Sequence, residues 1–383
     1  MSNILDYLKL RGDVPMSVDP FNEVDNLVLS EIAYTKLDGI VPGPEHLLKR
    51  INIKDASDLF FATHSKSELA PDNNGATANA PNVLKEAAAS RRFGKTKIFS
   101  YVNHIDVDSK VQFSAMSFIL PDHSIYVAYR GTDHTIVGWQ EDFNMSYLDA
   151  TPGQKQAADY LNRIAKFTLR PIHVGGHSKG GNFAVYAAAF SSNRSMKKIR
   201  DVWSNDGPGF NHSIADTEEY RNILPKVRSV VPEHSIIGMI MENAYSHEIV
   251  KSDAAGILQH DPMSWQVLKD KFEYKDKVAA SSEVIDEIIT KWSMQFDYDT
   301  RAAFVDVFFA SLQSSGATKM SEITSSKVRS VASLTKEIQS LDPDNQALVI
   351  DVFVKLLASG GDSLKNTLLS KLSKIPIMRK KEK

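Results

Sequence analysis

Hydrophobic residues recur with different periods along the chain and divide it into three stretches. The apolar positions of the first stretch recur mostly every three to five residues: Val24, Leu27, Val28, Ile32 and Leu37. This spacing predicts an amphipathic helix that runs to Gly39. The polar run 65–81 breaks every period and predicts a long loop, which is either a lid or a mere insertion. A helix is expected next, from Asn82 to about Phe93.

From about Lys97 the pattern becomes that of strands. Apolar runs at 98–102, 111–120 and 125–129 are separated by short turns, which predicts antiparallel hairpins. Helices are expected at 154–167 and 182–191, and strands at 172–175, 201–204 and 227–231. Strands that alternate with helices at this spacing are typical of an α/β fold with a mostly parallel central sheet.

Beyond Trp265 the apolar residues recur with helical spacing to the end of the chain. At roughly 150 residues per domain, a chain of 383 residues has room for two or three domains. We therefore expect an α/β domain, with its N-terminal helices, over residues 1–270 and a C-terminal helical region over 271–383.

Composition narrows the classes of function. The 45 Lys and Arg residues nearly balance the 47 Asp and Glu residues, so no overall field attracts nucleic acid or an anionic membrane. A hydrophobic share of 42% excludes disorder of the whole chain. The chain contains no cysteine, which excludes disulfides, thiolate metal sites and a cysteine nucleophile. Any nucleophile must therefore be an oxygen or an amine.

The N-terminal residues alternate charged and apolar side chains and lack the apolar core of a signal peptide. No run approaches the roughly 18 apolar residues of a membrane span. We therefore expect a soluble, cytoplasmic protein without a transmembrane segment.

One motif carries candidate chemistry. Gly176-His177-Ser178-Lys179-Gly180 has the form G-x-S-x-G, a strand-to-helix turn that lifts a serine hydroxyl out of a sheet. Gly176 and Gly180 are expected because a side chain there would crowd so tight a turn. The helix that follows would direct the Lys179 backbone N–H towards a developing oxyanion. The alternative is a glycine-rich turn with an incidental serine.

A serine becomes a good nucleophile when a histidine accepts its proton and a carboxylate orients that histidine. In this fold the order along the chain is serine, acid, histidine. Of the four histidines after Ser178, His260 is the best candidate because it lies in a loop after the last expected strand. His247 alternates on a strand, which favours a structural role.

Two carboxylates are candidates for the acid, since each follows a strand located after Ser178. Asp206 lies in a turn rich in Gly, Asn and Asp, and Glu233 follows the strand 227–231. Asp206 could equally be an Asx-turn residue that holds its own loop. The second oxyanion donor is expected after the strand 125–129, where Thr132 could supply its backbone N–H and its hydroxyl.

Several motifs in order resemble known families. Tyr129-Arg130-Gly131-Thr132 and Gly138-Trp139-Gln140-Glu141-Asp142 resemble the "RGT…W…D" region of class 3 (fungal-type) triacylglycerol lipases, and the serine turn resembles their G-H-S-L-G-G. More closely, the run from about Asn22 to Trp265 resembles the Mbeg1-like family, a lipase-like α/β-hydrolase group of bacterial proteins. Its further matching stretches are 26–34, 205–210, 235–239 and 259–265. The resemblance does not reach the C-terminal helices.

The resemblance implies an α/β-hydrolase fold with Ser178 as nucleophile, His260 as general base, and Thr132 and Lys179 as oxyanion donors. At the lipases' acid position this chain reads Ser235-Ile236-Ile237-Gly238. Asp206 or Glu233 could then supply the carboxylate from a neighbouring strand end, or the site could be a dyad. Lys179 replaces the usual apolar residue, so its side chain either favours a negatively charged substrate or reaches solvent.

The leading hypothesis is a serine esterase that cleaves an acyl ester or lipid through a covalent acyl-enzyme, without a cofactor or metal. Transient contact with a lipid interface fits such a substrate. A thioesterase or amidase on the same residues is one alternative. The other is a non-catalytic protein that binds an acyl ligand or a partner protein, which a missing acid would favour. The sequence does not indicate an oligomeric state.

Overall fold

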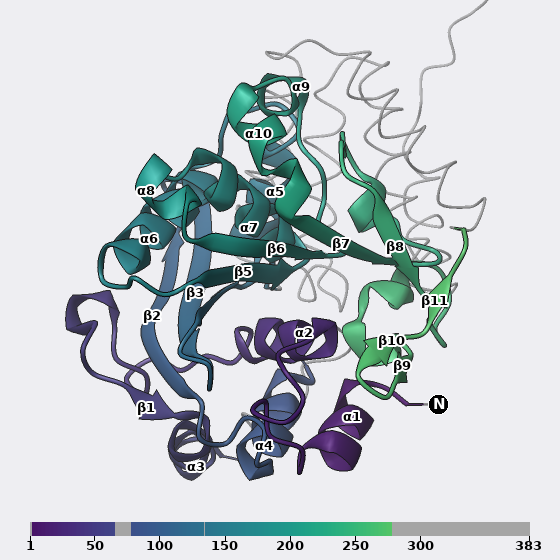
Figure 1. Cartoon of the computed structure of the whole chain (residues 1–383). Coiled ribbons are helices and arrows are strands. Elements are labelled where there is room, and N and C mark those ends of the chain that lie inside the picture. The colour runs from purple at the N-terminus through teal and green to yellow at the C-terminus, as the bar shows by residue number, and fades with distance from the viewer. Residues whose placement is uncertain (1, 66–77, 134, 278–383) are drawn as a thin grey trace, which may run out of the picture.

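A computed structural model describes residues 2–65, 78–133 and 135–277 of the chain. Its main sheet has nine strands in the order β1-β2-β3-β4-β5-β6-β7-β8-β11 (Figure 1). The strands are β1 (Ile51–Asn52), β2 (Lys97–Asp106), β3 (Val111–Ile119), β4 (Ile125–Tyr129), β5 (Ile172–His177), β6 (Ile199–Asn205), β7 (Val227–Pro232), β8 (His247–Val250) and β11 (Tyr274–Lys275).

The sheet is mixed. Strands β4 to β8 pair in parallel, whereas β1 to β4 pair antiparallel and β11 adds antiparallel to β8. The predicted hairpins and the predicted α/β core are therefore confirmed. Because β5, β6 and β7 run in the same direction, the segments that follow them emerge at one edge of the sheet.

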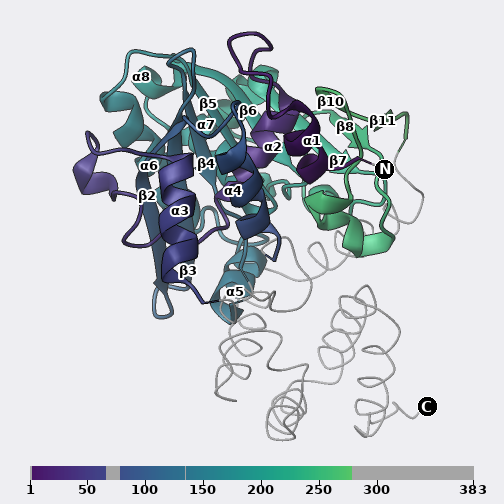
Figure 2. The same cartoon turned by 90° about the horizontal axis from the view of Figure 1, so that it is seen from below.

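Helices cover both faces of the sheet (Figures 1 and 2). One face carries α1 (Ile4–Arg11), α2 (Glu23–Ile32), α3 (Ile53–Thr63) and α4 (Ala80–Ala89). The other carries α6 (Pro152–Lys166), α7 (Lys179–Phe190) and α10 (Glu218–Ile223), with α5 (Ile136–Asn144) beside β3. Short elements complete the description: α8 (Asn193–Met196), α9 (His212–Ala215), η1 (Pro44–His46), η2 (Leu224–Lys226), η3 (Ile237–Met239), η4 (Gly256–His260), η5 (Pro262–Ser264) and the small sheet of β9 (Val267–Leu268) and β10 (Lys271–Phe272).

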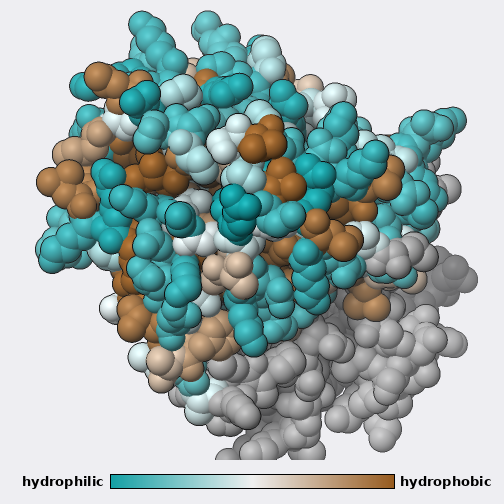
Figure 3. Space-filling model, turned by 60° about the horizontal axis from the view of Figure 1, so that its bottom comes forward, coloured by the Kyte–Doolittle hydropathy of each residue, from teal (hydrophilic) through white to brown (hydrophobic). Residues whose placement is uncertain are grey.

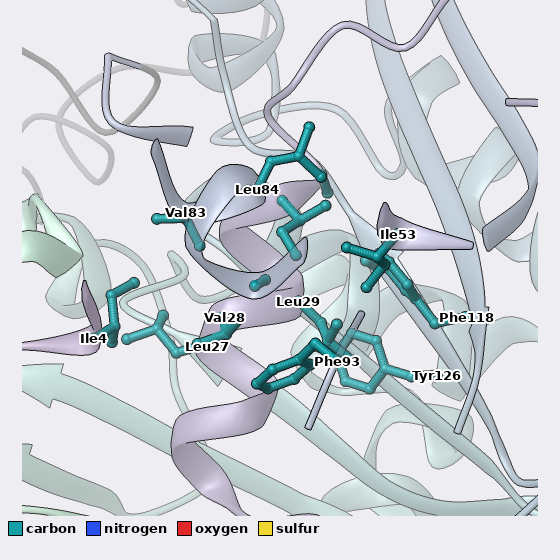
Figure 4. Packing of buried hydrophobic residues seen from close by; sticks show 14 of the residues in the cluster. Ile4, Leu27, Val28, Leu29, Ile53, Val83, Leu84, Phe93, Phe118 and Tyr126 are labelled. Carbon is teal, nitrogen blue, oxygen red and sulfur yellow. The ribbon is translucent and has the colours of Figure 1, made fainter. Parts of the chain in front are cut away.

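Each face of the sheet has its own hydrophobic core. Under α1 to α4, apolar residues of α2 interleave with those of α4 and of the strands below, as Figure 4 shows for Leu27, Val28, Leu84 and Phe118. The second core lies between the sheet and the α6–α7 pair and includes Phe183 and a run of alanines in α7. The small alanines let α7 approach β5 and β6 closely, which positions the start of α7 against the strand ends.

Helix α2 differs from the prediction in length and in environment. It ends at Ile32 rather than Gly39, and Ala33 is its C-cap. It is buried on all sides, because Val24 to Ile32 are all buried, so its polar residues as well as its apolar residues face protein. Its polar face points inward, where Asn26 donates a hydrogen bond of 2.9 Å to Asn205 Oδ1 on β6.

The segment after Trp265 also differs from the prediction. Instead of the helical structure expected beyond Trp265, the chain forms the strands β9, β10 and β11 after the single turn η5. The sheet thus continues past residue 270, because β11 pairs with β8. The expectation of a helix directly after Trp265 was wrong, since short apolar runs do not distinguish helix from strand by spacing alone. Most of the predicted 65–81 loop and the helices expected towards the C-terminus lie outside the described residues.

Figure 3 turns the side that carries α1 to α4 towards the viewer. Apolar areas on it are interspersed with hydrophilic side chains. Within residues 2–65, 78–133 and 135–277, no helix combines the length and apolar character needed to cross a membrane.

Candidate active site

Ser178 occupies a sharp turn between β5 and α7. Its backbone has φ 59° and ψ −134°, a region that a residue with a side chain rarely adopts and that stores strain. The flanking glycines are required by space: a Cβ on Gly180 would lie 2.1 Å from the Tyr129 carbonyl oxygen, and one on Gly176 would lie 2.4 Å from the Gly180 backbone. The turn thus has the geometry expected of the G-x-S-x-G motif.

Asp206 and His260 meet beside this turn. The Ser178 backbone N–H donates to the Asn205 carbonyl over 2.9 Å, which places the end of β6 next to the serine. Asp206 follows with φ 49° and is fully buried, and its Oδ2 lies 2.6 Å from His260 Nδ1. The His260 side chain remains 22% exposed. The histidine can therefore exchange protons with a ligand while its other nitrogen is held by a carboxylate.

The stretch 235–238, which departs from the lipase pattern, lies against the Asp206 carboxylate. Ser235 Oγ donates to Asp206 Oδ1 over 2.5 Å, and the Gly238 backbone N–H donates to the same oxygen over 3.1 Å. A Cβ on Gly238 would lie 2.4 Å from Asp206 Oδ1, so only glycine fits there. In this chain the carboxylate that faces His260 comes from Asp206, directly after β6. The stretch 235–238 supplies two hydrogen-bond donors to that carboxylate.

Glu233 and His247, the other residues weighed along the sequence, have other contacts. Glu233 forms an ion pair of 2.9 Å with Lys275 on β11. His247 lies on β8, where its Nδ1 is 2.8 Å from Ser229 Oγ, and burial lowers its pKa. Of the two candidate acids, the structure brings Asp206 and not Glu233 to the His260 ring.

A buried histidine ties the His260 loop to the serine turn. His177 Nε2 lies 2.9 Å from the His260 carbonyl oxygen. A carbonyl only accepts, so Nε2 carries the proton, and in a neutral ring Nδ1 accepts from the Tyr34 hydroxyl at 3.0 Å. The ring is neutral because burial, and next the proximity of His260, hold the pKa of His177 well below its usual value.

Glu31 lies behind this histidine on α2. It is fully buried, and its Oε1 is 3.7 Å from His177 Nδ1. Neither carboxyl oxygen has a hydrogen-bond partner among the described residues. Burial, and then the charge of Asp261, raise the pKa of Glu31 well above its ordinary value, so the fold favours the protonated form of this carboxyl.

The candidate oxyanion donors lie beside the Ser178 turn. A Cβ built on Gly131 would be 3.0 Å from the Ser178 Cβ, so the loop after β4 touches the serine turn. The Thr132 hydroxyl donates to Asp142 Oδ2 over 2.6 Å. This bond occupies the hydroxyl proton and leaves the backbone N–H as the donor that Thr132 can offer. The Lys179 backbone N–H is at the first position of α7, where helices have no internal acceptor.

The Lys179 side chain does not reach solvent, so that one of the two expectations for it was wrong. It is 1% exposed, and its Nζ lies 3.1 Å from Glu141 Oε2 and 3.8 Å from Asp142 Oδ1. Desolvation by the surrounding protein raises the pKa of Asp142 to about 6, although 28% of its side chain is exposed.

Several of these residues were missed as functional candidates. Glu141 and Asp142 stand in the quoted Gly138–Asp142 motif, and Glu31 and Tyr34 stand in the quoted stretch 26–34. The motifs were therefore the available signal, but sequence spacing does not show which residues meet when they are far apart along the chain. Among the described residues, no group of three or more His, Asp or Glu side chains could hold a metal ion.

Comparison with known proteins identifies the family. The profile of the Mbeg1-like family matches residues 87–310, more than half of the chain. The chain belongs to the Mbeg1-like family. This confirms the resemblance drawn from the motifs, and the match includes Ser178, Asp206 and His260. It extends to residue 310, so the expectation that the resemblance ends near Trp265 was wrong.

Part of the chain matches solved lipase structures at low similarity. A triacylglycerol lipase described as having a serine protease triad as its catalytic centre matches with 16% identity and a TM-score of 0.37, over 68% of this chain and 87% of the lipase. The Rhizomucor miehei lipase propeptide complex matches with 17% identity and a TM-score of 0.32. That match covers 50% of this chain but 65% of the complex chain, just under two thirds.

A lipase from Rhizopus microsporus var. chinensis matches with 16% identity and a TM-score of 0.33, over 53% of this chain and 72% of the lipase. No curated protein sequence matches this chain significantly.

Proposed function

We propose that this protein is a serine acyl hydrolase that cleaves a carboxylic ester, such as an acyl ester or a lipid. The observation that carries the proposal is the 2.6 Å contact between Asp206 Oδ2 and His260 Nδ1 next to the strained turn of Ser178. A histidine held by a buried carboxylate, beside a serine lifted out of a sheet, is the arrangement that activates a hydroxyl nucleophile.

The residues divide the reaction between them. Ser178 Oγ attacks the ester carbonyl while His260 Nε2 accepts the hydroxyl proton, and Asp206 stabilises the resulting imidazolium. The backbone N–H groups of Thr132 and Lys179 stabilise the negative oxygen of the tetrahedral intermediate. His260 then protonates the leaving alcohol, and water, activated by the same histidine, releases the acyl group from Ser178.

The contacts around Asp206 support this assignment of roles. A fully buried carboxylate needs compensation, and Asp206 receives hydrogen bonds from Ser235 and Gly238 in addition to the His260 contact. It therefore keeps its orientation as the charge on His260 changes. The alternative role for Asp206, an Asx-turn residue that only supports its own loop, does not require contact with a histidine.

Ester turnover by the full chain tests the proposal. The substrates are p-nitrophenyl esters of several acyl lengths, with a thioester and an amide series measured in parallel. Ser178→Ala is expected to lose turnover by at least about 10³-fold without loss of folding, measured by circular dichroism. Turnover retained in Ser178→Ala would contradict the proposal. A folded wild-type chain that binds these compounds but cleaves none of the three series would indicate a binding protein instead.

A further inference from the structure

Lys179 carries a buried charge directly after the candidate nucleophile. Its Nζ lies 3.1 Å from Glu141 Oε2 and 3.8 Å from Asp142 Oδ1, and both carboxylates belong to α5. The side chain therefore spans from the serine turn to the helix that follows the other oxyanion donor. Burying an ammonium group is costly unless it is paired, and here Glu141 and Asp142 supply the pairing.

Glu141, one partner of the Lys179 side chain, is held in place by several hydrogen bonds. It is fully buried, and its Oε1 accepts from the Gly153 backbone N–H over 2.9 Å, at the start of α6. Its Oε2 accepts from the Gln112 backbone N–H on β3 over 3.0 Å, as well as from Lys179. Glu141 thus joins Lys179 to two rigid elements and keeps α5 against them.

Asp142, the other partner of the Lys179 side chain, also contacts the oxyanion donor Thr132. Its Oδ2 accepts from the Thr132 hydroxyl over 2.6 Å. Its Oδ1 has no hydrogen-bond partner among the described residues and faces Lys179 Nζ at 3.8 Å. The position of Asp142, and with it the loop of Thr132, therefore depends on the charge of Lys179.

We propose that Lys179 is a positioning residue that couples the two halves of the oxyanion hole. Its backbone N–H is one donor, and its side chain fixes the other donor, Thr132, through Asp142 and Glu141. This inference rests on the proposed hydrolase function. Oxyanion donors stabilise a transition state only when they are held at the distance where the charge develops, and Lys179 fixes both donors from one residue.

A purely structural ion pair would give a different result. Loss of such a pair lowers the stability of the fold and leaves kcat and its pH dependence unchanged in the molecules that remain folded. A positioning residue alters kcat with little effect on KM, because the donors act in the transition state and not in substrate binding. The acid limb of kcat also distinguishes the two roles. Burial raises the pKa of Asp142, Lys179, the Thr132 hydroxyl and His260 lower it, and Glu141 raises it, so loss of Lys179 moves the ionisation of Asp142 to higher pH.

The test compares Lys179→Met, which keeps length without charge, with Lys179→Arg, which keeps charge. In the folded Met variant, kcat for a p-nitrophenyl ester is expected to fall about 10- to 100-fold, less than for removal of a donor, with KM within about threefold. Its acid limb is expected to move up by about one pH unit, and the Arg variant is expected to lose less. A matched control is Lys198→Met, because Lys198 Nζ donates to the Ala165 and Thr168 carbonyls, away from α5 and the serine turn.

A folded Met variant with wild-type kcat and acid limb, or with an altered KM alone, would overturn the inference. If Lys179→Met does not fold, Asp142→Asn interrupts the same connection and leaves the contact of Lys179 with Glu141 in place. That variant is expected to lose kcat at constant KM, and wild-type kcat there would equally overturn the inference. Turnover that persists in Ser178→Ala would instead refute the proposed function, so the two failures are distinguishable.

Discussion

The two sides of Ser178 are built from different interactions. On the side of the general base, a neutral histidine holds the His260 loop, because Nε2–H of His177 donates to the His260 carbonyl, and one buried carboxylate, Asp206, faces the ring. On the oxyanion side, an ionic cluster of Lys179, Glu141 and Asp142 holds the donors. The difference follows from chemistry, because a second positive charge beside His260 would oppose the imidazolium that forms there, whereas fixed charges suit donors that never change their protonation state.

The largest effect is expected from breaking the base side at its carboxylate. Asp206→Asn keeps the shape of the side chain but removes the charge that stabilises the imidazolium and selects its tautomer, so kcat is expected to fall about 10⁴-fold. The matched control is Glu233→Gln, since Glu233 contacts Lys275 and not the His260 ring. Ester kinetics on both variants check this, and equal losses in the two variants would contradict the choice of Asp206 as the acid.

A smaller effect is expected at the hydrogen bond that ties the His260 loop to the serine turn. His177→Phe keeps a ring without a donor, and leaving the His260 carbonyl unpaired is expected to lower kcat about tenfold. His177→Gln retains an amide donor and is expected to preserve most of the activity.

Both His177 variants remove the Nδ1 contact of Tyr34, so their difference isolates the bond to His260. Kinetics at saturating ester, with melting temperatures to verify folding, measure that difference. Indistinguishable kcat values would show that the tether does not position the base.

The smallest effect concerns Glu31 and is one of stability. The folded protein raises the pKa of Glu31, so between the ordinary pKa and the folded pKa the native state binds more protons than the unfolded state. The free energy of unfolding therefore falls as pH rises through this window, by up to about 1.4 kcal/mol per pH unit.

Glu31→Gln cannot ionise and lacks this slope. The stability of the wild type relative to Glu31→Gln should thus decrease steadily from about pH 4.5 upward. Urea unfolding of both proteins across pH checks it, and parallel curves would show that Glu31 is not buried in its protonated form.

The contrast between the two sides also shows what sequence reasoning could reach. The strands and the serine turn follow from local pattern: β4 has the predicted bounds, and the Gly176 and Gly180 positions are fixed by backbone contacts inside one motif. The sequence could not show which of Asp206 and Glu233 contacts His260, because parallel strands place both residues at the same edge of the sheet. The contact of Asp206 with His260 shows which carboxylate faces the ring, and the hydrogen bonds of Ser235 and Gly238 hold that carboxylate in place.

The environments of buried polar residues were harder to predict from the sequence than the strands and the serine turn. The spacing of α2 indicates one polar face, which in an isolated helix would point to water. In the fold that face is buried, because Asn26 and Ser30 find partners in Asn205 and Tyr126 across the sheet. Likewise, a lysine after the serine suggests solvent or substrate until Glu141 is found opposite it. Such pairings depend on long-range contacts that no local pattern contains.

The most direct test of the central claim, that Ser178 is a nucleophile activated by His260, is labelling of the purified chain with a fluorophosphonate probe. Only an activated serine reacts at a useful rate. We expect the wild type to be labelled, Ser178→Ala to be unlabelled and His260→Ala to react far more slowly. A folded wild-type chain that resists the probe, or labelling that persists in Ser178→Ala, would contradict the account.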